Sequence, residues 1–296
     1  MRVADLQLYG TLLGNLQRTR SQIMDSQEQI SSQKRVERPS DDPMAFGEIV
    51  LDKSALSQTQ QWIRNIEFGQ ARIDAADKAV SQAQDLVARI RELTIQGASD
   101  TTSAQGRVSI AQEVRQLDRQ LMQVANTEVG GQSIFAGTKT DVRPYSITTG
   151  DTVAYAGNSE TQSIAVSENQ TVQILIPGNT VFSGATTNVF NTVRDLLTAL
   201  ESNDRTGVQT QLGNLDLATS QLNDAQGTIG GVGNRLQVTK DALDTATLTI
   251  TQSISNNQDA DLATAITQLR LQEVAVQASS EAFSRIFDQS LLNYLK

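Results

Sequence analysis

The sequence predicts a mainly α-helical, elongated and nested rod with a small inserted antiparallel β domain. Three observations predict this fold class. Apolar residues recur with heptad spacing at both ends of the 296-residue chain, long segments with four-three apolar spacing lie between them, and short β-prone runs interrupt these segments near the middle. We expect three parts: terminal helical arms forming a coiled-coil module (1–38 plus 260–296), a long helical bundle (39–138 plus 188–259) and an inserted β domain (139–187).

The first segment, residues 1–34, is predicted to be one amphipathic helix. Its heptad a and d positions carry the apolar residues Leu6, Tyr9, Leu13, Leu16, Ile23 and Ile30. The a positions become polar after Leu13, whereas the d positions stay apolar. Because a 3.5-residue period gives only a narrow apolar stripe, we expect this helix to need a partner helix rather than to bury itself in a core of its own.

A proline-flanked turn follows this helix. Pro39 and Pro43 each disfavour α conformation in the preceding residue. Ser40, Asp41 and Asp42 are good N-cap types, and Pro43 suits the first position of a helix. The motif predicts a hinge that also begins the next helix. This explanation is favoured over a paired-carboxylate site for a metal or for acid–base work.

Two helices are predicted after the hinge, over residues 44–97 and 104–126. In the first, the small residues Gly69, Ala76 and Ala83 occur in the apolar row, so another helix could approach closely there. The lone Trp62 is expected to lie in the core.

The period changes between residues 130 and 187. Turn signals occur at Gly130-Gly131, Gly150-Asp151, Gly157-Asn158 and Pro177-Gly178-Asn179. Short β-prone runs lie at 152–155, 164–166, 172–176 and 181–182. Spacing of about ten residues between turns predicts a small antiparallel β unit.

Helical spacing resumes at residues 189–200 and 208–250, with a break at 202–204. The second of these segments contains the glycine patch Gly227, Gly230, Gly231 and Gly233. Without a preceding strand or a following Gly-Lys-Ser/Thr, the patch is not a phosphate loop, and it is interpreted as a close-packing or flexible site.

A second hinge is expected at residues 256–259, before a last helix at 260–294. This helix carries the second heptad stripe, whose interface residues are Leu262, Ile266, Leu269, Val276, Phe283 and Phe287 and which continues to Tyr294. Residues 1–38 carry a net charge of +2 and residues 257–296 a net charge of −2. Exposed ion pairs contribute only about 0–1 kcal/mol each, so this difference would bias the pairing of the two arms rather than drive it.

Composition excludes several functions. The formal charge of −9 argues against a nucleic-acid partner held through phosphates. The chain has no cysteine and no histidine, which removes disulfides, the commonest zinc ligands and the commonest general base. No run approaches the ~18–20 apolar residues that span a bilayer, and the first residues lack the apolar region of a secretory signal. We therefore expect no enzyme, no cofactor and no membrane insertion, and any export must use a route without such a signal.

Specific motifs resemble a known family. Residues 31–43, Ser-Ser-Gln-Lys-Arg-Val-Glu-Arg-Pro-Ser-Asp-Asp-Pro, resemble the amino-terminal signature shared by flagellins and flagellar hook-associated proteins. Residues 125–127 and 133–140 are similar to that family's entry into its β domain. Gly233-Asn-Arg-Leu, residues 259–264 and the ending at 290–295 resemble its carboxyl-terminal half. Gln33 stands where the family usually has glycine, and we expect it only to lengthen the first helix.

The resemblance implies a structural component of the bacterial flagellum at the hook–filament junction. Such a protein would leave the cell by the flagellar type III route and form an adaptor ring. Implied partners are copies of itself, the first hook-associated junction protein, flagellin and an export chaperone. The twelve stripe residues would be the assembly interface. Two alternatives stay open: flagellin itself, the filament subunit, and a cytoplasmic coiled-coil scaffold.

Overall fold

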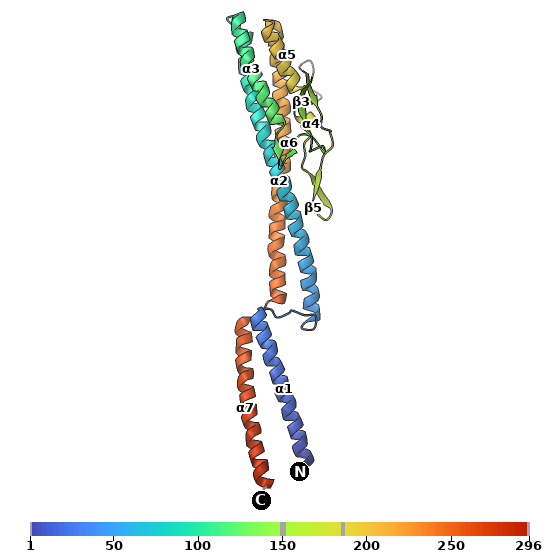
Figure 1. Ribbon diagram of the computed structural model, residues 1–296, viewed down its shortest axis with the longest axis vertical. Helices are drawn as coiled ribbons and strands as arrows, with labels where there is room; N and C mark the ends of the chain where they lie inside the picture. Colours follow the sequence, from blue (N-terminus) through green and yellow to red (C-terminus); the bar gives the residue numbers. More distant parts are fainter. Residues whose placement is uncertain (1, 149–151, 185–186, 295–296) are drawn as a thin grey trace. The chain divides into compact units, whose positions relative to one another are not determined.

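The computed structural model describes residues 2–148, 152–184 and 187–294 of the chain. Long helices dominate, and the strands are short (Figure 1). In chain order the elements are α1 (Arg2–Ser32), α2 (Pro43–Ala98), α3 (Ala104–Ala125), β1 (Glu128–Val129), β2 (Gln132–Ser133), β3 (Tyr145–Thr148), β4 (Thr152–Tyr155), β5 (Ser163–Ser167), β6 (Gln170–Gln173), α4 (Gly178–Val181), α5 (Val189–Glu201), α6 (Arg205–Gln258) and α7 (Leu262–Tyr294). The prediction of a mainly helical chain with a small antiparallel β insert is confirmed.

The chain divides into two compact units. The terminal unit comprises residues 1–58 and 246–296, and the central unit comprises residues 59–245. Helices α2 and α6 contribute residues to both units. The three-part division expected from the sequence stays a prediction.

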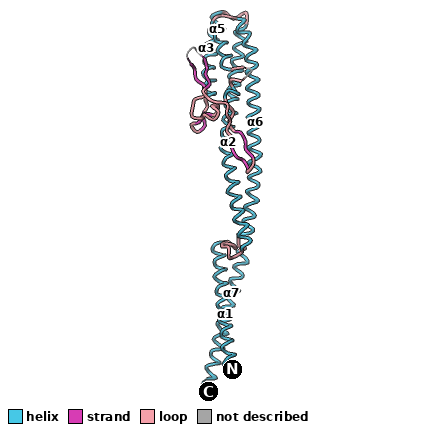
Figure 2. Tube along the Cα trace, turned by 90° about the vertical axis from the view of Figure 1, so that its right-hand side faces the viewer, coloured by secondary structure: helices cyan, strands magenta, loops and turns pink. Residues whose placement is uncertain are grey.

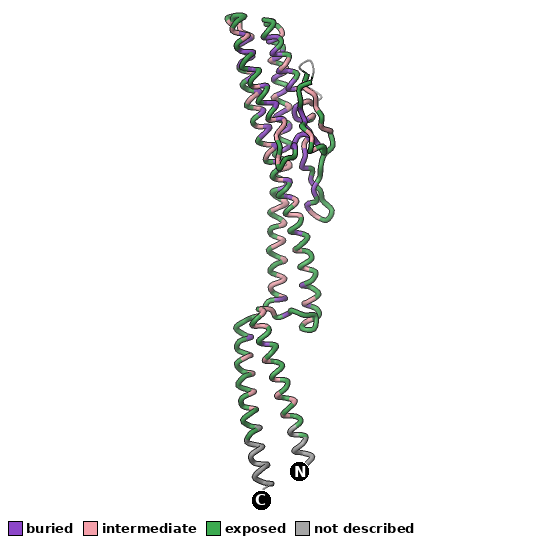
Figure 3. Tube along the Cα trace, in the orientation of Figure 1, coloured by how far each residue is buried: buried purple, intermediate pink, exposed green. Residues whose placement is uncertain are grey.

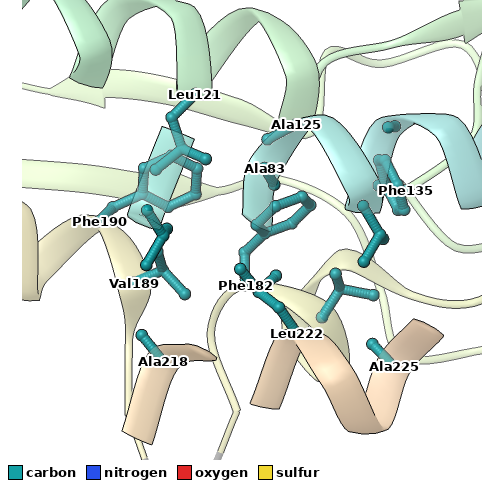
Figure 4. Close-up of a cluster of buried hydrophobic side chains, with 14 of the residues drawn as sticks. Ala83, Leu121, Ala125, Phe135, Phe182, Val189, Phe190, Ala218, Leu222 and Ala225 are labelled. Carbon is teal, nitrogen blue, oxygen red and sulfur yellow. The ribbon is translucent and has the colours of Figure 1, made fainter. Parts of the chain in front are cut away.

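The central unit holds the hydrophobic core. Apolar side chains of α2, α3, α5 and α6 pack together with residues of the β insert, and the buried positions gather in this unit (Figure 3). At its centre Phe135 and Phe182 meet edge to face with ring centroids 5.2 Å apart, and Phe190 packs beside Leu121 (Figure 4). The β insert therefore shares a core with the helices.

Within the described residues, the strands form three separate two-stranded antiparallel sheets rather than one unit, and Figure 2 shows the strands in magenta beside the helices. β1 pairs with β2, β3 with β4 and β5 with β6. β1, β2 and β3 lie outside the predicted β-prone runs. β3 pairs in register with the predicted β4, from Tyr145–Tyr155 to Thr148–Thr152.

The strand predicted at Val181-Phe182 is wrong. Pro177 precedes a short helix, α4, and the amide of Phe182 donates to the carbonyl of Gly178 over 2.7 Å. Pro177 is the N-cap of this single helical turn, with extended backbone at φ −61° and ψ 139°. Val181 and Phe182 are both buried, so their large apolar side chains serve the core from a helical turn rather than from a strand. Trp62 is only half-buried, so its assignment to the core is wrong as well.

The small-residue predictions have mixed outcomes. A Cβ added at Gly69 would lie 2.8 Å from both Ile164 and Ile174, so close packing there is confirmed, against strand residues as well as against α6. Around Gly227, Gly230 and Gly231 a Cβ would meet nothing within 4 Å. Close packing is therefore wrong for these three glycines, which lie on the exposed side of an uninterrupted α6.

Candidate assembly interface

Helices α1 and α7 of the terminal unit lie side by side (Figures 1 and 2). Their facing side chains are half-buried or buried and recur at four-three steps. On α1 they are Leu12, Leu16, Thr19, Ile23, Ser26 and Ile30, and on α7 they are Ala265, Leu269, Gln272, Val276 and Ser279. Ser26 is 5% exposed, and its hydroxyl donates to Gln272 Oε1 over 3.1 Å. Small and polar residues thus take five of these eleven seam positions.

The seam between α1 and α7 contains only part of the predicted heptad stripes, and the stripe residues as an assembly interface stay a prediction. Leu16, Ile23, Ile30, Leu269 and Val276 lie in the seam. Three predicted positions lie outside it and are exposed by 38–51%, namely Leu13, Leu262 and Ile266. The side chains of Leu6, Tyr9, Phe283 and Phe287 lie outside the described part of the structure. From Leu13 onward, the predicted a positions on α1 are each replaced in the seam by the residue before them, such as Leu12. Hydroxyl side chains mark this row at Thr19 and Ser26, and another lies in the seam at Ser279 of α7.

The terminal unit has almost no core. Among its described side chains, the buried ones are Ser26, Val36, Ala45, Ile49, Gln258 and Ala265. Ten of the fifteen exposed large apolar side chains of the described chain belong to this smaller unit. They are Leu13, Met24, Met44, Val50, Leu51, Leu248, Leu262, Ile266, Leu271 and Val274. Exposed large apolar side chains are therefore concentrated in the unit that has the smaller core.

The two connections between the helices of the terminal unit are joined to each other. Lys34 and Asp259 form an isolated antiparallel bridge. The amides of Arg35 and Val36 donate to the carbonyl of Gln258 over 2.6 and 3.3 Å. Beside this bridge Val36, Ala45 and Ile49 form a small buried cluster. The connections therefore form a hydrogen-bonded joint with its own packing.

Gln33 ends α1 instead of lengthening it, so that prediction is wrong. Its φ is +59°, in the left-handed region that glycine adopts most easily. The family's usual glycine at this position suits that backbone conformation, and Gln33 adopts it at an energetic cost.

Asp42 caps α2 as predicted. Its Oδ1 accepts a hydrogen bond from the amide of Ala45 over 3.1 Å, and Pro43 is the first helical residue. Its Oδ2 lies 3.1 Å from Arg35 Nη1. The amide of Ala45 first, and Arg35 second, hold the pKa of Asp42 below its ordinary value.

Asp41 has a different role from its neighbour. Its Oδ2 accepts from the amides of Glu37 and Arg38, over 3.0 and 2.8 Å. The Arg38 amide, and then the Glu37 amide, lower its pKa. Each carboxylate thus stabilises the backbone of the turn, while Pro39 and Ser40 are exposed within it.

The second hinge lies slightly later than predicted. α6 continues to Gln258, so residues 256–258 belong to its last turn. Asn257 Nδ2 donates to Glu48 Oε2 over 3.1 Å and ties this turn to α2. Asp261 caps α7, since its Oδ1 accepts from the amides of Ala263 and Thr264, and its hydrogen bonds with Thr264 are the largest cause of a lowered pKa.

The chemistry of this unit suits packing and hydrogen bonding between helices. Across the described ranges, no group of three or more acidic side chains is placed to hold a metal ion. Nor does any helix there combine the length and apolarity needed to cross a membrane.

Two regions of the sequence match families of known proteins. Residues 3–140 match the N-terminal helical region of bacterial flagellin, and residues 212–295 match the C-terminal helical region of bacterial flagellin. Both matches include one of the two terminal helices.

Individual relatives match over nearly the whole chain. Flagellar hook-associated protein 3 of Escherichia coli is 26% identical and is covered over 100% of each chain. Flagellin FlaB1 of Treponema pallidum is 26% identical over 94% of each chain. The structure of a putative flagellar hook-associated protein from Vibrio parahaemolyticus has the same fold, with a TM-score of 0.69 at 21% identity over 74% of this chain and 100% of that one.

Proposed function

Because the chain belongs to the bacterial flagellin family, with both helical regions matched in order, we propose that it is the flagellin-like structural subunit of the hook–filament junction. It is an extracellular component of the flagellum. The similarity to flagellar hook-associated protein 3, which extends over the full length of both chains, supports a position at the junction. The function is mechanical: a ring of subunits joins the hook to the filament.

The observation that carries this proposal is the incomplete burial of the terminal unit. Helices α1 and α7 bury one narrow seam between them and leave Leu13, Ile266 and Leu271 in solvent. An isolated pair of helices with so little apolar contact is marginal in water. Neighbouring subunits in a closed ring would cover these side chains, and a ring of like subunits places one face against a different face of the next copy.

The immediate partners follow from this position. We propose that copies of the chain contact each other within the ring, that the first hook-associated junction protein lies on the hook side, and that flagellin lies on the filament side. Export is expected to pass through the flagellar type III route, with a chaperone protecting the exposed terminal helices. The absence of cysteine removes any disulfide that would have to be broken before passage as an unfolded chain.

The second candidate is flagellin itself, which the alignment with Flagellin FlaB1 favours. The sequence ending at residues 292–295, Leu-Asn-Tyr-Leu, and the two prolines Pro39 and Pro43 favour the junction subunit instead. A cytoplasmic scaffold requires that the protein never reaches surface appendages.

Antibody labelling of isolated flagella distinguishes the three. The junction subunit is expected as one spot at the hook–filament boundary, whereas flagellin would be labelled along the filament and a cytoplasmic scaffold would be absent. Deletion of the gene is expected to release flagellin monomers into the medium, and restoration of the gene is the control. A deletion strain with intact filaments would contradict the proposal.

A further inference from the structure

Arg72 of α2 is a buried cation with unfilled hydrogen-bond donors. The residue is 2% exposed, and its Nε and Nη1 have no hydrogen-bond partner. Its Nη2 donates to Oε1 of Gln132 on β2. A buried charge is costly unless an opposite charge compensates for it. The amide of Gln132 is neutral, so it only partly compensates for the charge of the guanidinium.

The acidic side chains of α2 close to Arg72 in sequence are used elsewhere. Glu67 lies 2.9 Å from Lys240 Nζ. Asp74 accepts from Gln70 over 2.8 Å, and Asp77 accepts from Gln226 over 3.4 Å. Burial lowers the pKa of Arg72 below its ordinary value. The guanidinium thus lacks a carboxylate that its own helix could have supplied.

Two exposed side chains lie against the guanidinium of Arg72. The ring of Phe68 has its centroid 4.8 Å from the guanidinium carbon, and Phe68 is 49% exposed, although it is large and apolar. Gln132 is also exposed, next to the turn of the β1–β2 hairpin at Gly130 and Gly131, which both have positive φ. An aromatic ring and a displaceable amide therefore separate the buried charge from solvent.

We propose that Arg72 binds a carboxylate side chain from a neighbouring copy of this chain, which displaces the amide of Gln132. Displacement frees Nη2, and the carboxylate can then bridge Nη2 and one of the two empty nitrogens in the bidentate geometry that arginine favours. The partner covers Phe68 at the same time. We name this site, formed by Phe68, Arg72 and Gln132, the arginine site.

A second copy fits the arginine site by charge. Each chain carries 33 acidic and 24 basic side chains, so acidic side chains remain in excess on its neighbour. The inference rests on the proposed ring, in which each copy presents one face to a different face of the next. The contact would add a specific polar anchor to the apolar contacts of the terminal unit.

The decisive variant is Gln132→Glu, which supplies the missing carboxylate within the same chain. It is expected to raise the unfolding midpoint of the monomer by roughly 2–4 °C and to lower labelling at the junction about tenfold, which corresponds to about 1.4 kcal/mol. Gln132→Ala is the matched control and is expected to be incorporated at least as well as wild type. Normal incorporation of Gln132→Glu would overturn the inference.

Arg72→Met gives a second, independent test. Removing an unpaired buried charge is expected to leave the midpoint unchanged or higher, while incorporation again falls about tenfold. A lowered midpoint together with normal incorporation would make Arg72 a structural residue and overturn the inference. Wild-type protein that never reaches the junction would instead refute the proposed function.

The source of the carboxylate is tested with purified protein. Sedimentation at high concentration is expected to show weaker self-association for Gln132→Glu and Arg72→Met than for wild type. Unchanged self-association would assign the carboxylate to another flagellar subunit and overturn the choice of a second copy. Sodium acetate at constant ionic strength tests whether a free anion fills the site. A saturable rise in the unfolding midpoint of the wild type that is absent in Arg72→Met would assign the site to a free anion and overturn the choice of a second copy.

Discussion

The main-chain amide of Ala260 donates a hydrogen bond to the carbonyl oxygen of Gln33 over 3.0 Å. This bond joins the residue that ends α1 to the segment just before α7. The left-handed backbone of Gln33, with φ of +59°, lies at the turn that brings Lys34 into its bridge with Asp259. One strained residue thus lies within the joint between the two connections.

Gln33→Gly is expected to stabilise the protein by about 1 kcal/mol, because glycine adopts the left-handed conformation without the Cβ penalty. Urea unfolding measures the change. Gln27→Gly is the matched control: Gln27 is exposed within α1, so the same substitution is expected to destabilise by about 1 kcal/mol. Equal losses for the two variants would contradict the left-handed assignment.

Sequence periodicity predicted the bounds of α2 and α3 to within one residue, whereas α6 extends eight residues beyond the predicted apolar spacing. Four-three apolar spacing combined with Pro43 gave the start of α2, and the expected end at residue 97 lies next to the observed Ala98. The pattern works because these helices bury a continuous apolar face in the central unit, where burial decides the fold.

The pattern failed where the buried residues are not apolar. Ser26 is buried and donates to Gln272 of α7, and Thr19 is half-buried, while the apolar Leu13 is 51% exposed. Hydrophobic spacing alone cannot reveal a seam of small polar side chains. Nor does hydrophobic spacing reveal Arg72, whose guanidinium contacts Gln132 of a β hairpin distant in sequence, or the left-handed backbone of Gln33, which precedes the Lys34–Asp259 bridge.

Gly230→Ala is expected to stabilise the protein by about 1 kcal/mol. The glycine lies inside α6, and a Cβ there would meet nothing within 4 Å, so the substitution gains helix propensity without a clash. Gly69→Ala is the matched comparison within α2. Its Cβ would come within 2.8 Å of Ile164 and Ile174, so we expect a net loss of about 1 kcal/mol from overpacking. Thermal unfolding of the two variants tests this comparison. Stabilisation by both substitutions would show that Ile164 and Ile174 can move aside for the added Cβ at low energetic cost.

Acid is expected to weaken the joint of the terminal unit through Asp42. Its pKa is lowered in the folded protein, so its contribution is present above the unfolded pKa of about 3.9 and is lost as pH falls through the folded value. Unfolding from pH 2 to pH 7 measures this. Asp42→Asn keeps an N-cap acceptor but loses the pair with Arg35, so it is expected to be less stable than wild type at pH 7 and equal to it at the lowest pH. A constant difference across the range would refute the linkage.

Leu271→Ser is expected to impair incorporation at the junction while leaving the monomer's unfolding midpoint within about 1 °C of wild type. Leu271 is 66% exposed, and surface substitutions typically change stability by less than about 0.5 kcal/mol. Leu196→Ser is the control, since Leu196 is 0% exposed and its substitution is expected to destabilise by about 3 kcal/mol or more. Normal incorporation of Leu271→Ser would show that this side chain is not part of the interface.

Deletion of residues 1–30 or of residues 265–296 is expected to abolish incorporation. Either deletion removes one helix of the α1–α7 pair. The remaining helix then has no partner to cover its half-buried side chains and is expected to be only marginally helical in water. The central unit keeps its own core and is expected to unfold cooperatively at a nearly unchanged midpoint, which circular dichroism measures. A truncated protein that still assembles and supports motility would show that the terminal helices are not the assembly interface.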